Sequence, residues 1–332
     1  MALKIVEAHV PPELAPEAQE TLAELTSQTW TEPGGRFGSV IRAVLGAGRT
    51  GAALDALHDR IASRGGLLVL VEPLDAVLPR PLASSAPAVE DRAALHSAAA
   101  VSREEVYASI DDGAKLHRHF MLLVVLSALV AAIGLAQDNT AAVIGAMVVA
   151  PLLGPNMAIA LGLVLGDGSL VRRALGTIGV GFTLTLVFAT LFGLALDFDP
   201  TARELASRTR VTIWDLALAL AAGCAGAVAF TTGAPTYLTG VMVAVALLPP
   251  TVASGMYLSA GDLRSAGAAL LLAVGNVTAV TLAAILTFFW QGMRPRNWWL
   301  AERARSSARL GIAIFMVLFA ALAAVIFLFR AA

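Results

Sequence analysis

The sequence predicts a helical membrane domain of about seven spans that follows a small N-terminal α+β domain. Of its 332 residues, 58% are hydrophobic and 14% are charged, whereas soluble domains carry about 25% charged residues. Residues 1–118 carry 11 basic and 16 acidic side chains, and residues 119–332 carry 12 and 8. Most long apolar runs lie in the second part, so an acidic soluble part precedes a membrane part. This composition argues against an ordinary soluble enzyme, and without a strongly basic stripe no nucleic-acid partner is expected.

Residues 1–80 are expected to form a cytoplasmic α+β domain. Strand-like alternation and amphipathic helical spacing follow one another in the order β-α-β-β-α-β, which is typical of a ferredoxin-like domain. The start of the chain lacks the apolar core of a signal peptide, so this segment is expected to fold in the cytoplasm. The expected elements are strand 3–10, helix 13–25, strand 29–32, strand 37–45, helix 52–63 and strand 67–71.

This domain carries no convincing catalytic or metal-binding set. His58 has no second histidine or cysteine at ligand spacing. The glycine-rich stretch 46–51 (GAGRTG) follows a strand but lacks the Lys-Ser/Thr of a phosphate-binding loop, so a plain turn is the stronger interpretation. Cys224 is the single cysteine and can form no intrachain disulfide. We therefore expect no enzymatic activity, no metal and no cofactor.

Residues 81–118 are expected to be a linker followed by an interfacial helix. The stretch 79–87 (PRPLASSAP) has the composition of a linker. Ser102-x-x-Glu105 matches a capping box, which predicts a helix that starts there and runs towards the membrane.

The transmembrane domain is expected over residues 119–332. Lys and Arg in the flanking loops divide nine to five in favour of the side that holds the N-terminus, which predicts a cytoplasmic N-terminus in a bacterial inner membrane. Seven apolar segments are long enough to span the bilayer; they are 120–137, 139–166, 171–196, 211–232, 236–260, 265–290 and 310–329.

An internal repeat with an offset of 95 residues relates the first three spans to the next three. Residues 145–175 align without gaps on 240–270, with 12 identities in 31 positions. The matches include the pairs Pro155/Pro250 and Asp167/Asp262. Repeat one is 120–196, repeat two is 211–290, and 310–329 is an extra span. Because each repeat has an odd number of spans, the two must lie in opposite orientations, which is the inverted repeat common in transporters.

The middle span of each repeat is expected to be broken by proline. Proline removes a backbone donor, and free carbonyls are tolerated at membrane depth only inside protein or beside a wet cavity. The two breaks would meet near the midplane and offer polar groups to an ion or small solute; structural kinks are the alternative. The predicted binding residues are Pro151, Gly154, Pro155, Asn156, Pro249, Pro250, Thr251 and Asn276.

Among the polar candidates, Asn276 and Asp215 each have a structural interpretation as well as a functional one. Asn156 and Thr251 occupy equivalent positions after the breaks and would add side-chain oxygens. Asn276 lies deep in the sixth span, where interhelical hydrogen bonding explains it equally well. Asp138 and Asp215 are candidates for gating or an ion pathway, although Asp215 at the outer start of the fourth span also fits an interfacial role.

Three segments resemble a known family. GLAQDNTAAVIGAMVVAPLLGP (134–155), VMVAVALLPPT (241–251) and the segment around Asn276 are similar to the bacterial hydrophobic membrane proteins grouped as domain of unknown function 389. The resemblance covers most of the membrane part and implies a membrane protein of this class, without assigning an activity.

The leading hypothesis is a membrane transport protein, a channel or a carrier, with a cytoplasmic regulatory or assembly domain. The expected partners are the lipid bilayer, the transported ion or small solute, and further copies of the chain, since small residues such as those of Gly162-x-x-x-Gly166 permit close helix contact. The alternative is a non-transporting membrane sensor or scaffold whose soluble domain binds a ligand or partner.

Overall fold

The computed structural model describes residues 3–34, 38–74, 103–210, 212–234, 236–293, 312–321 and 324. The chain divides into two compact units, one made of residues 1–106 with 231–233 and the other of the remaining residues. The predicted linker 79–87 and Ser102 of the capping box lie outside the described residues.

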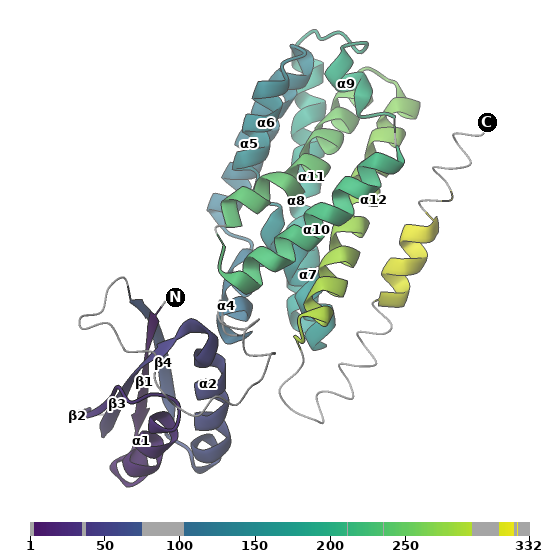
Figure 1. The fold of residues 1–332 in the computed structure, drawn as a ribbon. Coiled ribbons are helices and arrows are strands. Elements are labelled where there is room, and N and C mark those ends of the chain that lie inside the picture. The colour runs from purple at the N-terminus through teal and green to yellow at the C-terminus, as the bar shows by residue number, and fades with distance from the viewer. Residues whose placement is uncertain are drawn as a thin grey trace. The chain divides into compact units, whose positions relative to one another are not determined.

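The N-terminal unit is a four-stranded antiparallel sheet with two helices (Figure 1). Its strands lie in the order β2-β3-β1-β4, and β1 pairs with both β3 and β4. This order and the chain order of the elements are those of the predicted ferredoxin-like domain. The elements are β1 (Leu3–Val10), η1 (Pro12–Leu14), α1 (Ala15–Ala23), β2 (Thr29–Pro33), β3 (Ser39–Gly46), α2 (Ala47–Ile61), η3 (Ala62–Arg64) and β4 (Leu68–Leu74).

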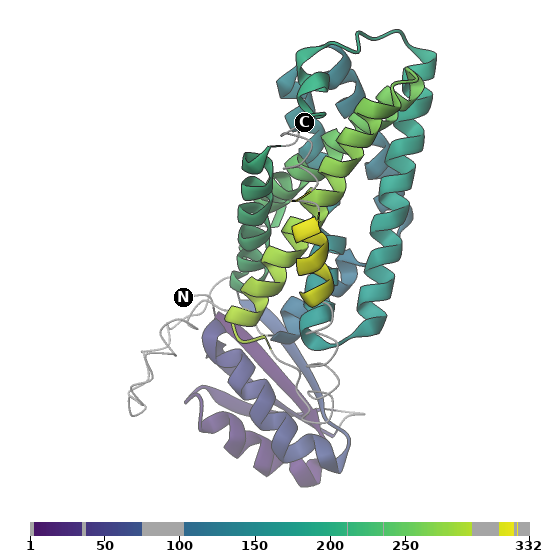
Figure 2. The same ribbon diagram turned by 90° about the vertical axis from the view of Figure 1, so that its right-hand side faces the viewer.

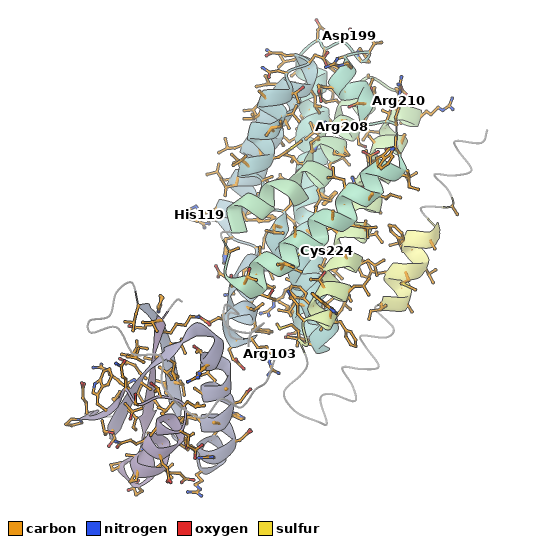
Figure 3. The ribbon with its side chains drawn as sticks, viewed as in Figure 1. Arg103, His119, Asp199, Arg208, Arg210 and Cys224 are labelled. Atoms are coloured by element: carbon orange, nitrogen blue, oxygen red, sulfur yellow. The ribbon has the colours of Figure 1, made fainter. Side chains whose placement is uncertain are left out.

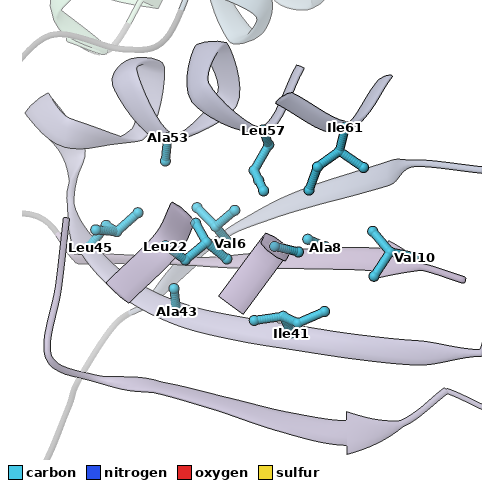
Figure 4. Packing of buried hydrophobic residues seen from close by; sticks show 11 residues of the cluster. Val6, Ala8, Val10, Leu22, Ile41, Ala43, Leu45, Ala53, Leu57 and Ile61 are labelled. Carbon is cyan, nitrogen blue, oxygen red and sulfur yellow. The ribbon is translucent and has the colours of Figure 1, made fainter. Parts of the chain in front are cut away.

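The core of this unit lies between one face of the sheet and the two helices (Figure 4). Alternate residues of β1 are buried, which is the period-2 pattern of a strand with one covered face. The glycine-rich stretch 46–51 is not a turn, because α2 already begins at Ala47. The fully buried residues include Val6, Ala8, Val10, Leu22, Ile41, Ala43, Ala53, Leu57 and Ile61.

The second unit is a bundle of apolar helices (Figures 1 and 2). Four of its described helices, α5, α8, α10 and α12, are long and apolar enough to cross a membrane, and the bent pair α6–α7 would make five. The helices are α4 (Arg103–Gly113, whose first turn belongs to the N-terminal unit), α5 (Arg118–Ala136), α6 (Thr140–Val149), α7 (Leu153–Leu165), α8 (Gly168–Ala195), α9 (Arg203–Ser207), α10 (Ile213–Thr232), α11 (Thr236–Ser259) and α12 (Leu263–Trp290).

The apolar segments of the sequence correspond closely to these helices. Helix α11 packs against α12, α8 and α6, whereas α7 packs against α8 and α12. Of the seventh predicted span, 310–329, the structure describes mainly the helix Ile312–Ala321. The arrangement of seven spans in an inverted repeat stays a prediction.

The second predicted span is broken where the prolines predict it. Helix α6 ends at Val149, and Ala150 is extended with φ −68° and ψ 120°. A residue that precedes proline is pushed out of the helical region, which explains why the helix ends before Pro151. Helix α7 begins at Leu153, and the two helices are bent by 52°.

The predicted break in the fifth span is wrong. Pro249 and Pro250 lie inside α11, which continues from Thr236 to Ser259. Adjacent prolines remove two neighbouring donors within a single turn, and packing against α8 and α12 keeps that turn helical. In the first repeat Pro151 and Pro155 stand four residues apart on either side of Gly154, so successive turns are affected.

The turns that join the spans match at the same 95-residue offset. Asp167 and Asp262 both cap the following helix, with nearly identical φ and ψ of −85°, 86° and −86°, 82°. The backbone N–H of Asp167 donates to Gly162 O, and that of Asp262 donates to Tyr257 O. The preceding turns are alike too, with positive φ at Asp138 and Gly233 and with matching bonds from Asn139 to Gly134 and from Ala234 to Ala229.

Candidate functional site

The most unusual polar residue of the helical unit is Asn156, in the first turns of α7. Its side chain is fully buried, and its Oδ1 accepts a hydrogen bond of 2.8 Å from the hydroxyl of Thr281 in α12. Its Nδ2 has no hydrogen-bond partner among the described residues. Because a buried polar group without a partner is costly, such a group requires an explanation.

The break next to Asn156 leaves backbone groups outside the helical ladder. The residue before α7, Leu152, offers no side-chain cap to the first N–H groups of the helix. Pro151 lacks the N–H that would continue the ladder of α6. Leu152 and Leu153 are nevertheless buried. At the break, polar backbone groups therefore lie among buried apolar side chains.

The polar side chains of the second repeat are arranged differently around the break from what the sequence predicts. Thr251 is buried, but its hydroxyl donates to Leu247 O in its own helix at 2.8 Å. Asn276 is 3% exposed in α12, the helix that also carries Thr281. The hydrogen bond across 125 residues thus joins Asn156 to Thr281, and Thr251 is engaged locally.

The break is packed against neighbouring helices through glycines. A Cβ on Gly113, at the end of α4, would lie 2.9 Å from the Cα of Gly154. Gly226 of α10 lies beside Leu153 and Met157, because a Cβ there would lie 3.2–3.4 Å from those side chains. Small residues that permit such close approach are typical of helix contacts in membranes.

Helix α4 is held on the first repeat by polar contacts near the α7–α8 turn. The hydroxyl of Tyr107 donates to Asp167 Oδ2 at 2.7 Å, and Arg173 forms an ion pair with Asp111 at 2.6 Å. The hydroxyl of Thr177 donates to Ala114 O at 2.7 Å. These contacts and the glycine pair fix the last two turns of α4 beside the break.

The Tyr107–Asp167 contact alters both pKa values. The hydrogen bond to Asp167, with desolvation, raises the pKa of Tyr107 to about 12. Desolvation opposes ionisation of Asp167, but hydrogen bonds from Tyr107, Ser169 and Leu170 outweigh it and lower the pKa of that carboxyl. The pair therefore stays phenol and carboxylate around neutral pH.

The two acidic candidates for an ion pathway lie at helix ends. Asp138, with φ 55°, accepts a hydrogen bond from the N–H of Glu204 in α9. Asp215 accepts from the N–H and hydroxyl of Thr212, before α10. Figure 3 shows Asp199, Arg208 and Arg210 at this α9 end of the unit. A pocket of about 420 Å³ there is lined by Thr201, Arg203, Ala206, Ser207, Arg210, Thr212 and Asp215.

Sequence reasoning finds Asn156 and the first break but misses the groups that meet them. Thr281 lies five residues after Asn276, inside the apolar segment 265–290, and its full burial appears only in the structure. Gly113 carries no local signal for its contact with Gly154. In the described ranges no group of three or more His, Cys, Asp or Glu could hold a metal ion.

Comparisons with known proteins place these features in a family. Residues 147–282 match a family model described as "Domain of unknown function (DUF389)", a range that includes both Asn156 and Thr281. The chain is 32% identical over 236 residues to an uncharacterized protein of Methanocaldococcus jannaschii, an alignment that covers 71% of this chain and 74% of that protein. No solved structure matches the chain.

Proposed function

Because the chain belongs to the DUF389 family and its apolar helices indicate a membrane protein, we propose that it transports an ion or small solute past the break between α6 and α7. The buried Asn156 amide beside interrupted backbone carries the proposal. Irregular backbone at membrane depth is tolerated where it is enclosed by protein or lines a solute pathway. A polar side chain buried in a membrane helix is costly, so it is a candidate for a functional residue.

The proposed architecture is an inverted repeat of α5–α8 and α10–α12. The matching turns at Asp167/Asp262 and at Asp138/Gly233 support it. Three spans in each repeat require opposite orientations, and transporters of this kind hold their substrate where broken helices meet the other repeat. Here the hydrogen bond between Asn156 and Thr281 joins the two repeats beside the break.

The mechanism is a relative movement of the two repeats that makes and breaks this hydrogen bond. Asn156 and the first turn of α7 bind the solute while Thr281 orients the Asn156 amide. When α12 moves relative to α7, the bond between them breaks and the solute exchanges with one side. The protein supplies binding and gating and no covalent chemistry.

In this proposal the protein spans a bacterial inner membrane several times, with the N-terminal unit in the cytoplasm. The excess of Lys and Arg on that side of the predicted spans supports the orientation. The N-terminal unit has a core of its own, which suits a regulatory or assembly role. Several copies of the chain assemble in the membrane through small-residue helix faces.

Current across a planar bilayer that contains the purified protein tests the proposal. With asymmetric KCl and NaCl, steps absent from protein-free controls and reduced in Asn156→Leu are the expected result. Ser127→Ala on α5 is the matched control, because Ser127 is also fully buried but donates to Val124 O in its own helix. No current, together with no tracer uptake into proteoliposomes, would overturn transport and favour the sensor or scaffold.

A further inference from the structure

The pocket at the α9 end of the helical unit carries charges of both signs. Its volume of about 420 Å³ lies within the range of pockets that bind small ligands, about 300–1,000 Å³. Among the described residues, the charged ones that line it are Arg203, Arg210 and Asp215. Neither Asn156 nor Thr281 lines it, so this pocket is distinct from the proposed solute site.

The two arginines are the donors that this pocket offers to a ligand. In the described part of the chain neither Arg203 nor Arg210 makes an ion pair, whereas Arg208 between them is paired with Glu204 at 3.2 Å. The lining hydroxyls already donate to neighbouring oxygens, Thr201 to Asp199, Ser207 to Glu204 O and Thr212 to Asp215. Guanidinium groups without a carboxylate partner suit the oxygens of a phosphate group, which they bind bidentately.

Asp215 adds an acceptor of negative charge to the same pocket. Both hydrogen bonds that it receives, from the N–H and the hydroxyl of Thr212, end on its Oδ2. Its Oδ1 accepts no hydrogen bond from the described residues, so this oxygen is left for a ligand. An ammonium group is the donor that matches a carboxylate in charge. The pocket therefore suits a ligand that carries a phosphate and an ammonium group.

An exposed apolar face of α10 begins beside this pocket. Trp214 is 79% exposed, and Leu218 one turn further on is 46% exposed. Helix α10 has 20 residues, and at about 1.5 Å per residue it matches a hydrocarbon core of about 30 Å. The start of α10 would then lie at the level of the lipid headgroups, where tryptophan is enriched. A polar pocket at the end of an apolar, exposed helix face suits a lipid.

We infer that the pocket binds a phospholipid whose headgroup carries an ammonium group, as phosphatidylethanolamine does. Arg203 and Arg210 bind its phosphate, and Oδ1 of Asp215 accepts from its ammonium N–H. The acyl chains lie along the exposed face of α10, past Trp214 and Leu218. The inference requires that the protein lies in a membrane, and it does not depend on transport.

Two variants remove the two halves of the site. Arg203→Gln with Arg210→Gln removes both guanidinium groups. Asp215→Asn removes the negative charge while its amide oxygen can still accept from Thr212. Arg172→Gln with Arg264→Gln is the matched control, because these arginines are also exposed and do not line this pocket. The control changes the net charge by the same amount as the first variant.

The measurement is the melting temperature of the purified full chain in detergent micelles, titrated with phospholipids that have the same acyl chains. Phosphatidylethanolamine should raise it more than phosphatidylcholine, whose headgroup has the same phosphate but no N–H. The half-maximal lipid concentration should rise at least about tenfold without Arg203 and Arg210 and stay unchanged in the control. Asp215→Asn should reduce the advantage of phosphatidylethanolamine over phosphatidylcholine.

Four outcomes would overturn the inference. Equal shifts with phosphatidylethanolamine and phosphatidylcholine, or a larger shift with phosphatidylglycerol, would exclude recognition of the ammonium group. An unchanged titration in the Arg203→Gln, Arg210→Gln variant would exclude the phosphate contacts. Glycerophosphoethanolamine, which has the same headgroup and no acyl chains, separates a lipid from a soluble phosphate ester. If it stabilises the protein as well as the lipid does, the occupant is not a lipid.

Discussion

Gly113 and Gly154 touch backbone to backbone, so that a Cβ added to either would lie 2.9 Å from the Cα of the other. Gly113 ends α4, and Gly154 is the second residue of α7. The last turn of α4 therefore packs directly on the helix that begins at the break. This contact depends on the absence of two side chains.

Gly154→Ala should destabilise the helical unit by about 1–3 kcal/mol, because the new methyl group overpacks the contact with Gly113. The measurement is the free energy of unfolding in mixed micelles. Gly145→Ala in α6 is the matched control, since a Cβ there meets nothing within 4 Å. That control should be neutral or stabilising by up to about 1 kcal/mol. Equal effects of the two substitutions would contradict the close contact.

Thr281→Val should cost about 1 kcal/mol, because it leaves the buried Oδ1 of Asn156 without its donor. Thr278→Val is the matched control on the same helix. Thr278 is equally buried but donates to Val274 O within α12. Its substitution should cost less than about 0.5 kcal/mol, as measured by unfolding in micelles. If Thr278→Val costs as much free energy of unfolding as Thr281→Val or more, the hydrogen bond between Asn156 and Thr281 does not stabilise the protein.

The two caps at the matching turns should differ in strength. Asp262→Ala removes the side-chain cap on the N–H of Ser265 and should lower the melting temperature only slightly. Asp167→Ala also removes the bond from Tyr107 and should cost about 2–3 kcal/mol in total. Thermal unfolding of both variants checks the order. The reverse order would show that the Tyr107 contact adds nothing.

Tyr107→Phe should reveal a pH-dependent difference from the unchanged protein. The raised pKa of Tyr107, about 12 against an ordinary 10.0, stabilises the fold fully below pH 10, and this contribution is lost as the pH rises through 12. The lowered pKa of Asp167 stabilises the fold above its ordinary pKa of 3.8, and this contribution is lost as the pH falls through the folded value.

The gap in melting temperature between Tyr107→Phe and the unchanged protein should therefore be constant at neutral pH and narrow at both extremes. Substitution at neutral pH should cost about 1–2 kcal/mol, the size of one hydrogen bond to a charged group at a half-buried site. A gap that does not change from pH 5 to pH 12 would contradict the assigned pair.

Local patterns in the sequence determined much of the fold. Alternation predicted the strands of the N-terminal sheet, apolar length predicted the long helices, and Gly-Asp pairs marked the matching turns at residues 167 and 262. The position of the first break also follows from Pro151, since the residue before proline avoids the helical region. These features depend on neighbours within a few residues, and the sequence contains them directly.

Only the tertiary structure decided which of two similar proline motifs interrupts its helix and which groups meet at the break. Pro249 and Pro250 leave α11 continuous because helices distant in the sequence pack around it. Asn156 meets Thr281 across 125 residues, whereas its expected counterpart Thr251 bonds to its own helix. Gly113 meets Gly154 because packing selects where two backbones approach. Such pairings depend on the positions of whole helices, which no local pattern encodes.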